Sequence, residues 1–299
     1  MVLSDFGAGS LLTDAVERLQ RSGSPSPRLD AELLLSHALG RDRAWLHAHP
    51  EGSVAGDAEA LFAGWVRRRE TGEPIAYIRG FKEWFSLHVA VDPRALIPRP
   101  ETELLAESAI HEIAARLVRD AAPIVAWDVA TGSGAIALAI ALRFRAALAL
   151  RRLRLVASDV SPEALELAAE NLAGHGAADR ATLACADLLD PAGGQLPIPD
   201  FVVANLPYVA TAEVDAGTGS LAFEPRAALD GGRDGLDVVR RLLAQLPDRL
   251  APGGVALLEI GAGQAAAVRA AIDDVPLRAI VTALPDLAGI DRVIRIARL

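Results

Sequence analysis

The chain has 299 residues, of which 52% are hydrophobic and 23% are charged. This balance is typical of a globular protein with a substantial core and excludes a chain that is disordered as a whole. The formal net charge of −9 disfavours a protein that coats nucleic acid through a basic face, so we expect no stable nucleic-acid binding. The single cysteine, Cys185, excludes an internal disulfide and a cysteine-clustered metal site.

The N-terminal segment carries Asp5 and Asp14 and lacks the basic region and apolar run of a signal peptide. The most apolar stretch, residues 135–150, is interrupted by Arg143 and Arg145 and is too short to span a bilayer. We therefore expect a cytoplasmic protein that binds no membrane, with residues 135–150 as a buried helix.

Only helical patterns occur in the first part of the chain. Pro27 opens an apolar run at helical spacing that Gly40 closes, and a second run covers residues 57–71. From Glu73 to Val91 the residues become strand-like, notably at Tyr77-Ile78, and turn signals separate them. We predict a helical domain over residues 1–72, a β-hairpin linker over 73–98 and a catalytic domain over 99–299.

A helix is expected from Glu101 to Val118, and from Ile124 onward short apolar runs alternate with helical patterns. The predicted strands are 124–129, 153–158, 181–186, 200–205, 254–260 and 291–299. Strands separated by helices predict right-handed crossovers and a mostly parallel, doubly wound α/β sheet. The last strand alternates apolar and basic residues, which is typical of an antiparallel or edge strand.

A glycine-containing loop follows the first of these strands and precedes a helix. Gly132 and Gly134 permit a tight turn there, where a ligand approaches main-chain atoms at a helix N-terminus. Asp159 ends the next strand, where a carboxylate accepts the hydroxyls of a ribose. Together these residues predict a nucleoside-cofactor site. They also satisfy the fingerprint of NAD enzymes, so they do not decide between cofactors.

The strand at 200–205 ends in Asn205-Leu206-Pro207-Tyr208, at the edge of the sheet where open α/β folds bind substrate. The side-chain oxygen of Asn205 and the carbonyl of Leu206 suit the two hydrogens of a planar NH2 group, and the ring of Tyr208 suits its π face. An NAD enzyme has no use for this arrangement. By contrast, methyl transfer from S-adenosylmethionine to an amide or amino nitrogen requires such an arrangement.

At these motifs the chain resembles the release factor glutamine N5-methyltransferases, and the resemblance covers most of its length. The matching segments are 72–80, 96–103, 128–135, 159–162, 224–226 and 230–235. The resemblance implies a class I S-adenosylmethionine-dependent methyltransferase domain with a Rossmann-like, mostly parallel seven-stranded sheet and an antiparallel last strand. It also implies a small helical bundle and a β-hairpin linker before that domain.

Members of this family methylate the glutamine side-chain amide in the Gly-Gly-Gln motif of peptide chain release factors, which are therefore the implied partners. The resemblance implies S-adenosyl-L-methionine as cofactor, with the binding residues Ala130, Thr131, Gly132, Ser133, Gly134, Asp159, Asp187, Leu188 and Asn205. It implies the catalytic residues Asn205, Pro207 and Tyr208, and the acceptor-binding residues Asn205, Leu206, Pro207 and Tyr208. The histidines lack acidic or cysteine companions at ligand spacing, so we expect no metal site.

Two positions depart from the family pattern. Leu206 replaces a proline, which removes a fixed φ but keeps the carbonyl that accepts a hydrogen bond. Ala130 replaces a glycine, which costs roughly 1 kcal/mol or more if this residue needs a positive φ. Asn-Leu-Pro-Tyr also resembles the tetrapeptide of rRNA adenine N6-methyltransferases. Adenine N6 of rRNA, a glutamine of a ribosomal protein, and an idle cofactor-binding protein therefore stay open as alternatives.

Three further segments permit two interpretations each. Arg99, Glu101 and Glu103 either approach the cofactor or cap the following helix. Residues 211–222 form a loop that either closes over substrate or simply connects two elements. Residues 230–235 predict a structural turn into a helix.

Overall fold

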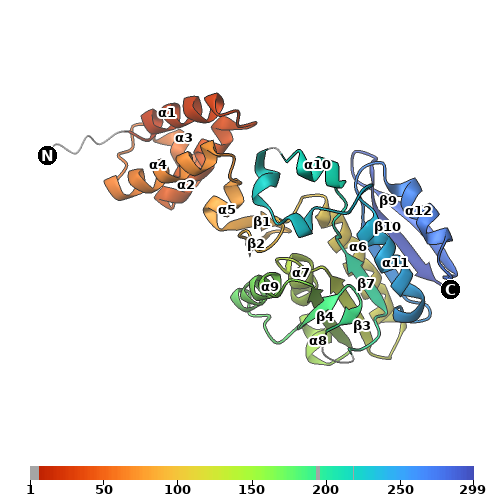
Figure 1. Cartoon of the computed structure of the whole chain (residues 1–299). Coiled ribbons are helices and arrows are strands. Elements are labelled where there is room, and N and C mark those ends of the chain that lie inside the picture. Colours follow the sequence, from red (N-terminus) through yellow and green to blue (C-terminus); the bar gives the residue numbers. More distant parts are fainter. Residues whose placement is uncertain (1–6, 193–195, 218) are drawn as a thin grey trace. The chain divides into compact units, whose positions relative to one another are not determined.

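The computed structural model describes residues 7–192, 196–217 and 219–299 (Figure 1). The described residues of Met1–Phe81 and Thr218–Phe223 form one compact unit, and those of Lys82–Gly217 and Glu224–Leu299 form a second. The three-part division at residues 72 and 98 stays a prediction. No helix among the described residues is long and apolar enough to cross a membrane.

The first unit is built from helices, as expected. They are α1 Ala8–Arg21, α2 Pro27–Leu39, α3 Arg43–Ala48, α4 Gly56–Glu70 and α5 Ile75–Arg79. Their core contains Leu19, Leu34, Leu35 and Phe62. Pro27 occupies the first position of α2, and the left-handed Gly40 ends it, so both predicted helix signals are confirmed.

Helix α5 corrects the strand-like interpretation of Tyr77 and Ile78. Both residues are buried, and they lie in a short helix that starts after Pro74 and stops at Gly80, whose φ is +79°. Burial against the other helices overrides the strand propensity of Tyr and Ile here. The hairpin itself is confined to β1 Phe81–Trp84 and β2 Leu87–Ala90.

The second unit contains the predicted sheet. Its strands are β3 Ile124–Val129, β4 Leu153–Asp159, β5 Thr182–Asp187, β6 Asp190–Pro191, β7 Phe201–Ala204, β8 Val255–Glu259, β9 Ala279–Pro285 and β10 Asp291–Arg298. The order is β6-β5-β4-β3-β7-β8-β10-β9, with β5, β4, β3, β7 and β8 parallel. β10 is antiparallel to both neighbours, which confirms the expected last strand. The sheet has eight strands and not the expected seven, because the two-residue strand β6 is added at one edge.

Every residue of β7 and β8 is buried, as expected for a sheet whose two faces are both covered by helices. The helices of this unit are α6 Thr102–Arg119, α7 Ala135–Arg143, α8 Arg145–Ala149, α9 Pro162–Gly174, α10 Thr211–Asp215, α11 Asp237–Arg249 and α12 Ala265–Asp273, with a 3₁₀ turn at Arg226–Ala228. A second 3₁₀ turn, Gly219–Phe223, belongs to the first unit. Figure 1 shows α11 and α12 side by side next to β10. The single buried helix expected over 135–150 is wrong: the helix breaks at Phe144, and α8 has no buried residue.

The strand order creates a switch point beside β3. The chain moves from β3 to β4 and β5 on one side, and then returns to place β7 on the other side. Val129 of β3 pairs with Ser158 of β4 and with Ala204 of β7, which in turn pairs with Leu258 of β8. The residues that follow these four are Ala130, Asp159, Asn205 and Glu259. One row at the carboxyl edge of the sheet therefore carries the candidate site, where open α/β sheets bind ligands.

Candidate active site

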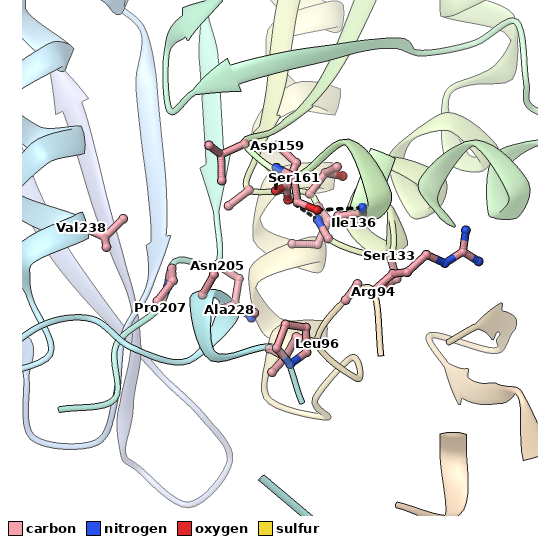
Figure 2. Close-up of a pocket in the computed structure, with 18 of the residues that line it drawn as sticks. Arg94, Leu96, Ser133, Ile136, Asp159, Ser161, Asn205, Pro207, Ala228 and Val238 are labelled. Carbon is pink, nitrogen blue, oxygen red and sulfur yellow. Dashed lines mark hydrogen bonds between the residues drawn. The ribbon is translucent and has the colours of Figure 1, made fainter. Parts of the chain in front are cut away.

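A cavity of about 380 Å³ lies at this carboxyl edge, within the second unit (Figure 2). Predicted site residues that line it are Ala130, Thr131, Gly132, Ser133, Asp159, Asp187, Leu188, Asn205 and Pro207. Gly134, Leu206 and Tyr208 are not among its lining residues. The cavity has the size of a small-molecule site and brings the glycine loop and the Asn-Leu-Pro-Tyr segment together.

A buried carboxylate holds the glycine loop in place. Oδ2 of Asp128 accepts hydrogen bonds from the hydroxyl of Thr131 at 2.6 Å and from the backbone N–H of Ala137 at 3.0 Å. Burial raises the pKa of Asp128 to about 7, although these two bonds oppose the shift. The loop is therefore tied to the end of β3 and to the first turns of α7.

Gly134 serves packing rather than the cavity. It has a φ of +78°, and a Cβ atom there would lie 2.9 Å from the Cβ of Ala168 in α9. Any side chain would push α7 and α9 apart at this point. Ala130, by contrast, has a φ of +56° while carrying a methyl group. Ala130 therefore does adopt the positive φ at which its methyl group causes strain, in contrast to the glycine of the family pattern.

Asp159 connects the loop to the end of β4. Its Oδ2 accepts the N–H of Gly132 and its Oδ1 accepts the N–H of Ser161, each at 2.9 Å. Burial raises the pKa of Asp159, and the backbone N–H groups oppose this. Each carboxylate oxygen retains the capacity for a further bond. These features suit the hydroxyls of a ribose.

The cavity wall next to Asp159 is largely apolar. Val160, Leu188 and Val238 line it, and Leu188 holds a φ of +59°. Asp187 also lines the cavity, where its carboxylate pairs with Arg241 at 2.5 Å. A planar aromatic base with polar edges fits such a wall.

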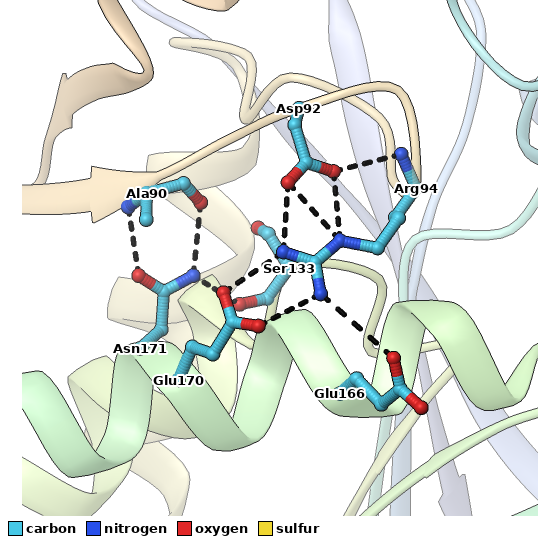
Figure 3. A network of polar contacts seen from close by, with 7 residues as sticks. All are labelled: Ala90, Asp92, Arg94, Ser133, Glu166, Glu170 and Asn171. Carbon is cyan, nitrogen blue, oxygen red and sulfur yellow. Dashed lines mark hydrogen bonds and ion pairs between the residues drawn. The ribbon is translucent and has the colours of Figure 1, made fainter.

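Another lining residue, Arg94, is fixed from outside the cavity (Figure 3). Its guanidinium donates to Asp92 at 2.7 Å and to Glu170 of α9 at 2.8 Å. Beside it, Nδ2 of Asn171 donates to the carbonyls of Ala90 and Ser133, at 2.9 Å and 2.8 Å. These contacts tie the segment after the hairpin to the glycine loop.

Residues 205–208, here called the acceptor segment, lie in two different environments. Asn205 and Pro207 line the cavity, and Nδ2 of Asn205 donates to the hydroxyl of Thr102 at 3.0 Å. The side chain of Leu206 is buried in the core between the sheet and its helices. The hydroxyl of Tyr208 lies 3.4 Å from Oε1 of Glu259, and burial raises the pKa of Tyr208 to about 12.

Residues 230–235 support this segment from behind. A Cβ atom at Gly231 would lie 2.6 Å from the carbonyl oxygen of Pro207, and one at Gly235 would collide with the carbonyl of Tyr208. Nε2 of Gln264 also donates to the Tyr208 carbonyl, at 2.9 Å. The turn is structural, as predicted, and the structure shows what it supports: the backbone of the acceptor segment.

The segment 96–103 braces the cavity through its polar residues. Arg99 forms an ion pair of 2.6 Å with the fully buried carboxylate of Glu224, which also accepts the N–H of Ile97. Glu103 accepts the N–H of Phe85 in the hairpin turn. None of Arg99, Glu101 and Glu103 lines the cavity, so an approach to the cofactor is not observed.

Several residues of the candidate site were not predicted from the sequence. Leu96, Pro98, Thr102, Ile136, Val160, Ser161, Pro225, Ala228 and Val238 also line the cavity. Glu259 was missed too, although its place at the end of a buried central strand was a usable signal. Residues 211–215, expected as a loop, form α10, and Thr211 donates to Asp230 at 2.7 Å. Among the described residues, no group of three or more His, Cys, Asp or Glu side chains is placed to hold a metal ion.

Comparisons with known proteins agree with this geometry. A family model described as the PrmC N-terminal domain matches residues 10–80. The hMettl16 catalytic domain, solved in complex with MAT2A 3'UTR hairpin 6, aligns with a TM-score of 0.51 and 14% identity over 80% of this chain and 81% of that one. At that identity the alignment shows the methyltransferase fold alone.

Two curated relatives cover nearly the whole chain. The release factor glutamine methyltransferase of Koribacter versatilis (strain Ellin345) is 40% identical over 286 residues, which is 94% of each chain. That of Moorella thermoacetica (strain ATCC 39073 / JCM 9320) is 41% identical over 284 residues, which is 94% of this chain and 95% of the relative. The NAD alternative is therefore wrong, and the chain belongs to the release factor glutamine methyltransferase family.

Proposed function

We propose that the chain transfers a methyl group from S-adenosylmethionine to the side-chain amide nitrogen of the Gly-Gly-Gln glutamine in peptide chain release factors. The observation that carries this proposal is the shared cavity of Asp159, the glycine loop and Asn205. The names of the curated relatives support the acceptor.

The cavity residues fit the proposed cofactor. Asp159 would hold the ribose hydroxyls, and Val160, Leu188 and Val238 would pack around the adenine, with Asp187 near its edge. Residues 130–133 would lie along the methionine portion. When bound, S-adenosylmethionine supplies an electrophilic methyl group on its sulfonium.

The acceptor segment would orient the glutamine. The Asn205 side-chain oxygen and the Leu206 carbonyl would accept the two N–H hydrogens of the amide, while the ring of Tyr208 would flank its π face. Burial of the Leu206 side chain holds that backbone carbonyl without the family's proline. The nitrogen is thereby aimed at the methyl group.

An amide nitrogen is a weak nucleophile because its lone pair is delocalised. The chain's contributions are therefore orientation, exclusion of water and hydrogen bonds that favour a localised lone pair. The amide nitrogen would accept the methyl group as its bond to the sulfonium sulfur breaks, and the amide would then lose one proton. Among the described cavity residues, the only carboxylates are Asp159 and Asp187, and there is no histidine. We infer that proton loss needs no dedicated strong base.

The experiment uses purified release factor, ribosomal protein and rRNA, each incubated with the chain and methyl-labelled cofactor. We expect label in release factor only. Label confined to rRNA would refute the proposed acceptor and favour adenine N6, and label confined to ribosomal protein would favour another glutamine. Tight cofactor binding without transfer to any acceptor would support an idle cofactor-binding protein.

We further propose that residues 1–72 recognise the folded release factor and that the chain acts in the cytoplasm, where translation takes place. Removing residues 1–72 should weaken methylation of whole release factor and leave cofactor affinity unchanged. Methylation of a short Gly-Gly-Gln peptide serves as the control. Equal loss on peptide and whole protein would contradict a recognition role.

A further inference from the structure

A line of buried polar groups runs behind the acceptor segment. Nδ2 of Asn205 donates to Oγ1 of Thr102 at 3.0 Å. Oε2 of Glu259 is buried without a hydrogen-bond partner among the described residues, and the neighbouring Thr102 hydroxyl lowers the pKa of this carboxyl group. The hydroxyl of Tyr208 donates to the same carboxylate at 3.4 Å. Thr102 is 4% exposed and Glu259 is 1% exposed. Glu259 does not line the cavity, so any effect it has on the acceptor passes through its neighbours.

The direction of these bonds follows from the chemistry of the groups. An ionised carboxylate only accepts hydrogen bonds, so the single hydrogen of the Thr102 hydroxyl, directed toward Glu259, would satisfy the unpartnered oxygen of that carboxylate. The lone pairs of Thr102 are then left for the NH2 group of Asn205. The amide oxygen of Asn205 is consequently the atom available to the cavity.

We propose that Thr102 and Glu259 are positioning residues that fix the Asn205 amide with its oxygen facing the acceptor nitrogen. The inference rests on the proposed function of Asn205 as a ligand of the acceptor NH2. A flipped amide would instead present its own N–H groups to the N–H groups of the acceptor, which excludes an attractive contact. The pair therefore selects for an acceptor that offers N–H hydrogens.

Protonation of Glu259 would remove the constraint. A carboxylic acid can donate to Thr102, whose hydrogen is then free to turn toward Asn205 and allow the flipped amide. The groups that face the carboxylate are Thr102 and Glu101 from the start of α6, Tyr208, and Arg292 of β10. Burial and Glu101 favour the protonated form, whereas Thr102, Tyr208 and Arg292 favour the ionised form.

The chain itself provides a direct test, because Asn171 and Asn205 are its only asparagines. In protein carrying isotope-labelled asparagine, two side-chain NH2 groups appear in the NMR spectrum. Asn171 is the internal control, since its NH2 group donates to backbone carbonyls and not to this line (Figure 3). The variants are Thr102→Val, which removes the hydroxyl at similar volume, and Thr102→Ser, which retains it.

In the wild-type chain and in Thr102→Ser, the chemical shifts of the Asn205 NH2 protons should differ from those of a free amide. These protons should also exchange slowly with solvent. In Thr102→Val their exchange should accelerate about tenfold or more, while the Asn171 signals stay unchanged. Methyl transfer to release factor should fall about tenfold in kcat with cofactor affinity retained, and Thr102→Ser should restore it.

Unchanged Asn205 exchange and unchanged transfer in Thr102→Val would overturn the inference. Changed Asn171 signals in that variant would also overturn it, because the effect would then be a general loosening. The proposed function fails separately, if wild-type chain does not methylate release factor. The NMR comparison does not depend on that result.

Discussion

The side-chain nitrogen of Asn205 lies 3.0 Å from the hydroxyl oxygen of Thr102, so the first turn of α6 orients a residue at the carboxyl end of β7. Two segments that resemble the same family, far apart in the chain, therefore meet at one hydrogen bond. Thr102 itself lines the cavity, whereas its charged neighbours brace the surrounding backbone. The segment 96–103 thus lines the cavity with uncharged residues, namely Leu96, Pro98 and the hydroxyl-bearing Thr102.

Replacing Asn205 by alanine should reduce methyl transfer by about 100-fold or more, because one of the two oxygens that orient the acceptor nitrogen is lost. Cofactor affinity should stay within a few fold, since Asp159 and the glycine loop are untouched. Calorimetric titration and initial rates measure the two quantities. Unaltered transfer in this variant would remove the role given to Asn205.

Asp159→Asn should weaken cofactor binding by about tenfold or more. The amide NH2 would face one of the backbone N–H groups of Gly132 and Ser161 that the carboxylate now accepts. Asp190→Asn is the matched control, because Asp190 is exposed, pairs with Arg249 and does not line the cavity. Equal affinity in the two variants would argue against Asp159 as the ribose ligand.

Ala130→Gly should raise the free energy of unfolding by about 1 kcal/mol, because glycine adopts the φ of +56° without the strain of a methyl group. Ala267→Gly, at an exposed position inside α12, should lower that free energy by about 0.5–1 kcal/mol. Urea unfolding of both variants gives the comparison. A loss of stability in both would mean that the positive φ of Ala130 is not a source of strain.

Stability should depend on pH through the carboxyl groups whose pKa values burial raises, which are Glu259, Asp128 and Asp159. Burial raises the pKa values of Glu259 and Asp128 to about 7, from ordinary values of 4.5 and 3.8. Between the ordinary and the raised values the folded chain binds more protons than the unfolded chain, so the free energy of unfolding falls as pH rises toward and through 7. Methyl transfer should rise over the same range, as Glu259 ionises and fixes Asn205.

Glu259→Gln isolates the contribution of this residue. The variant should show a shallower fall of melting temperature between about pH 5 and pH 8, with the remaining slope due to Asp128 and Asp159. Its methyl transfer should lose the rise near neutral pH. An identical pH profile in wild type and variant would assign the titration to other groups.

The sequence predicted the parallel strands and placed the glycine loop and Asp159 at their carboxyl ends, because apolar periodicity and loop chemistry are local signals. It did not reveal Thr102 and Glu259, since their roles depend on how α6 and β8 pack beside β7. The strand predicted at Tyr77 and Ile78 was wrong because their local strand preference is overridden by burial in a helical unit. The positive φ of Ala130 likewise follows from the loop that Asp128 and Asp159 hold, and no single residue type signals it.

The central claim is tested most directly by mass spectrometry of a purified release factor after incubation with this chain and S-adenosylmethionine. The account predicts one added methyl group on the Gly-Gly-Gln glutamine, and none when Asn205→Ala replaces the wild-type chain. An unmodified glutamine, in a reaction where the same wild-type enzyme methylates rRNA or a ribosomal protein, would contradict it.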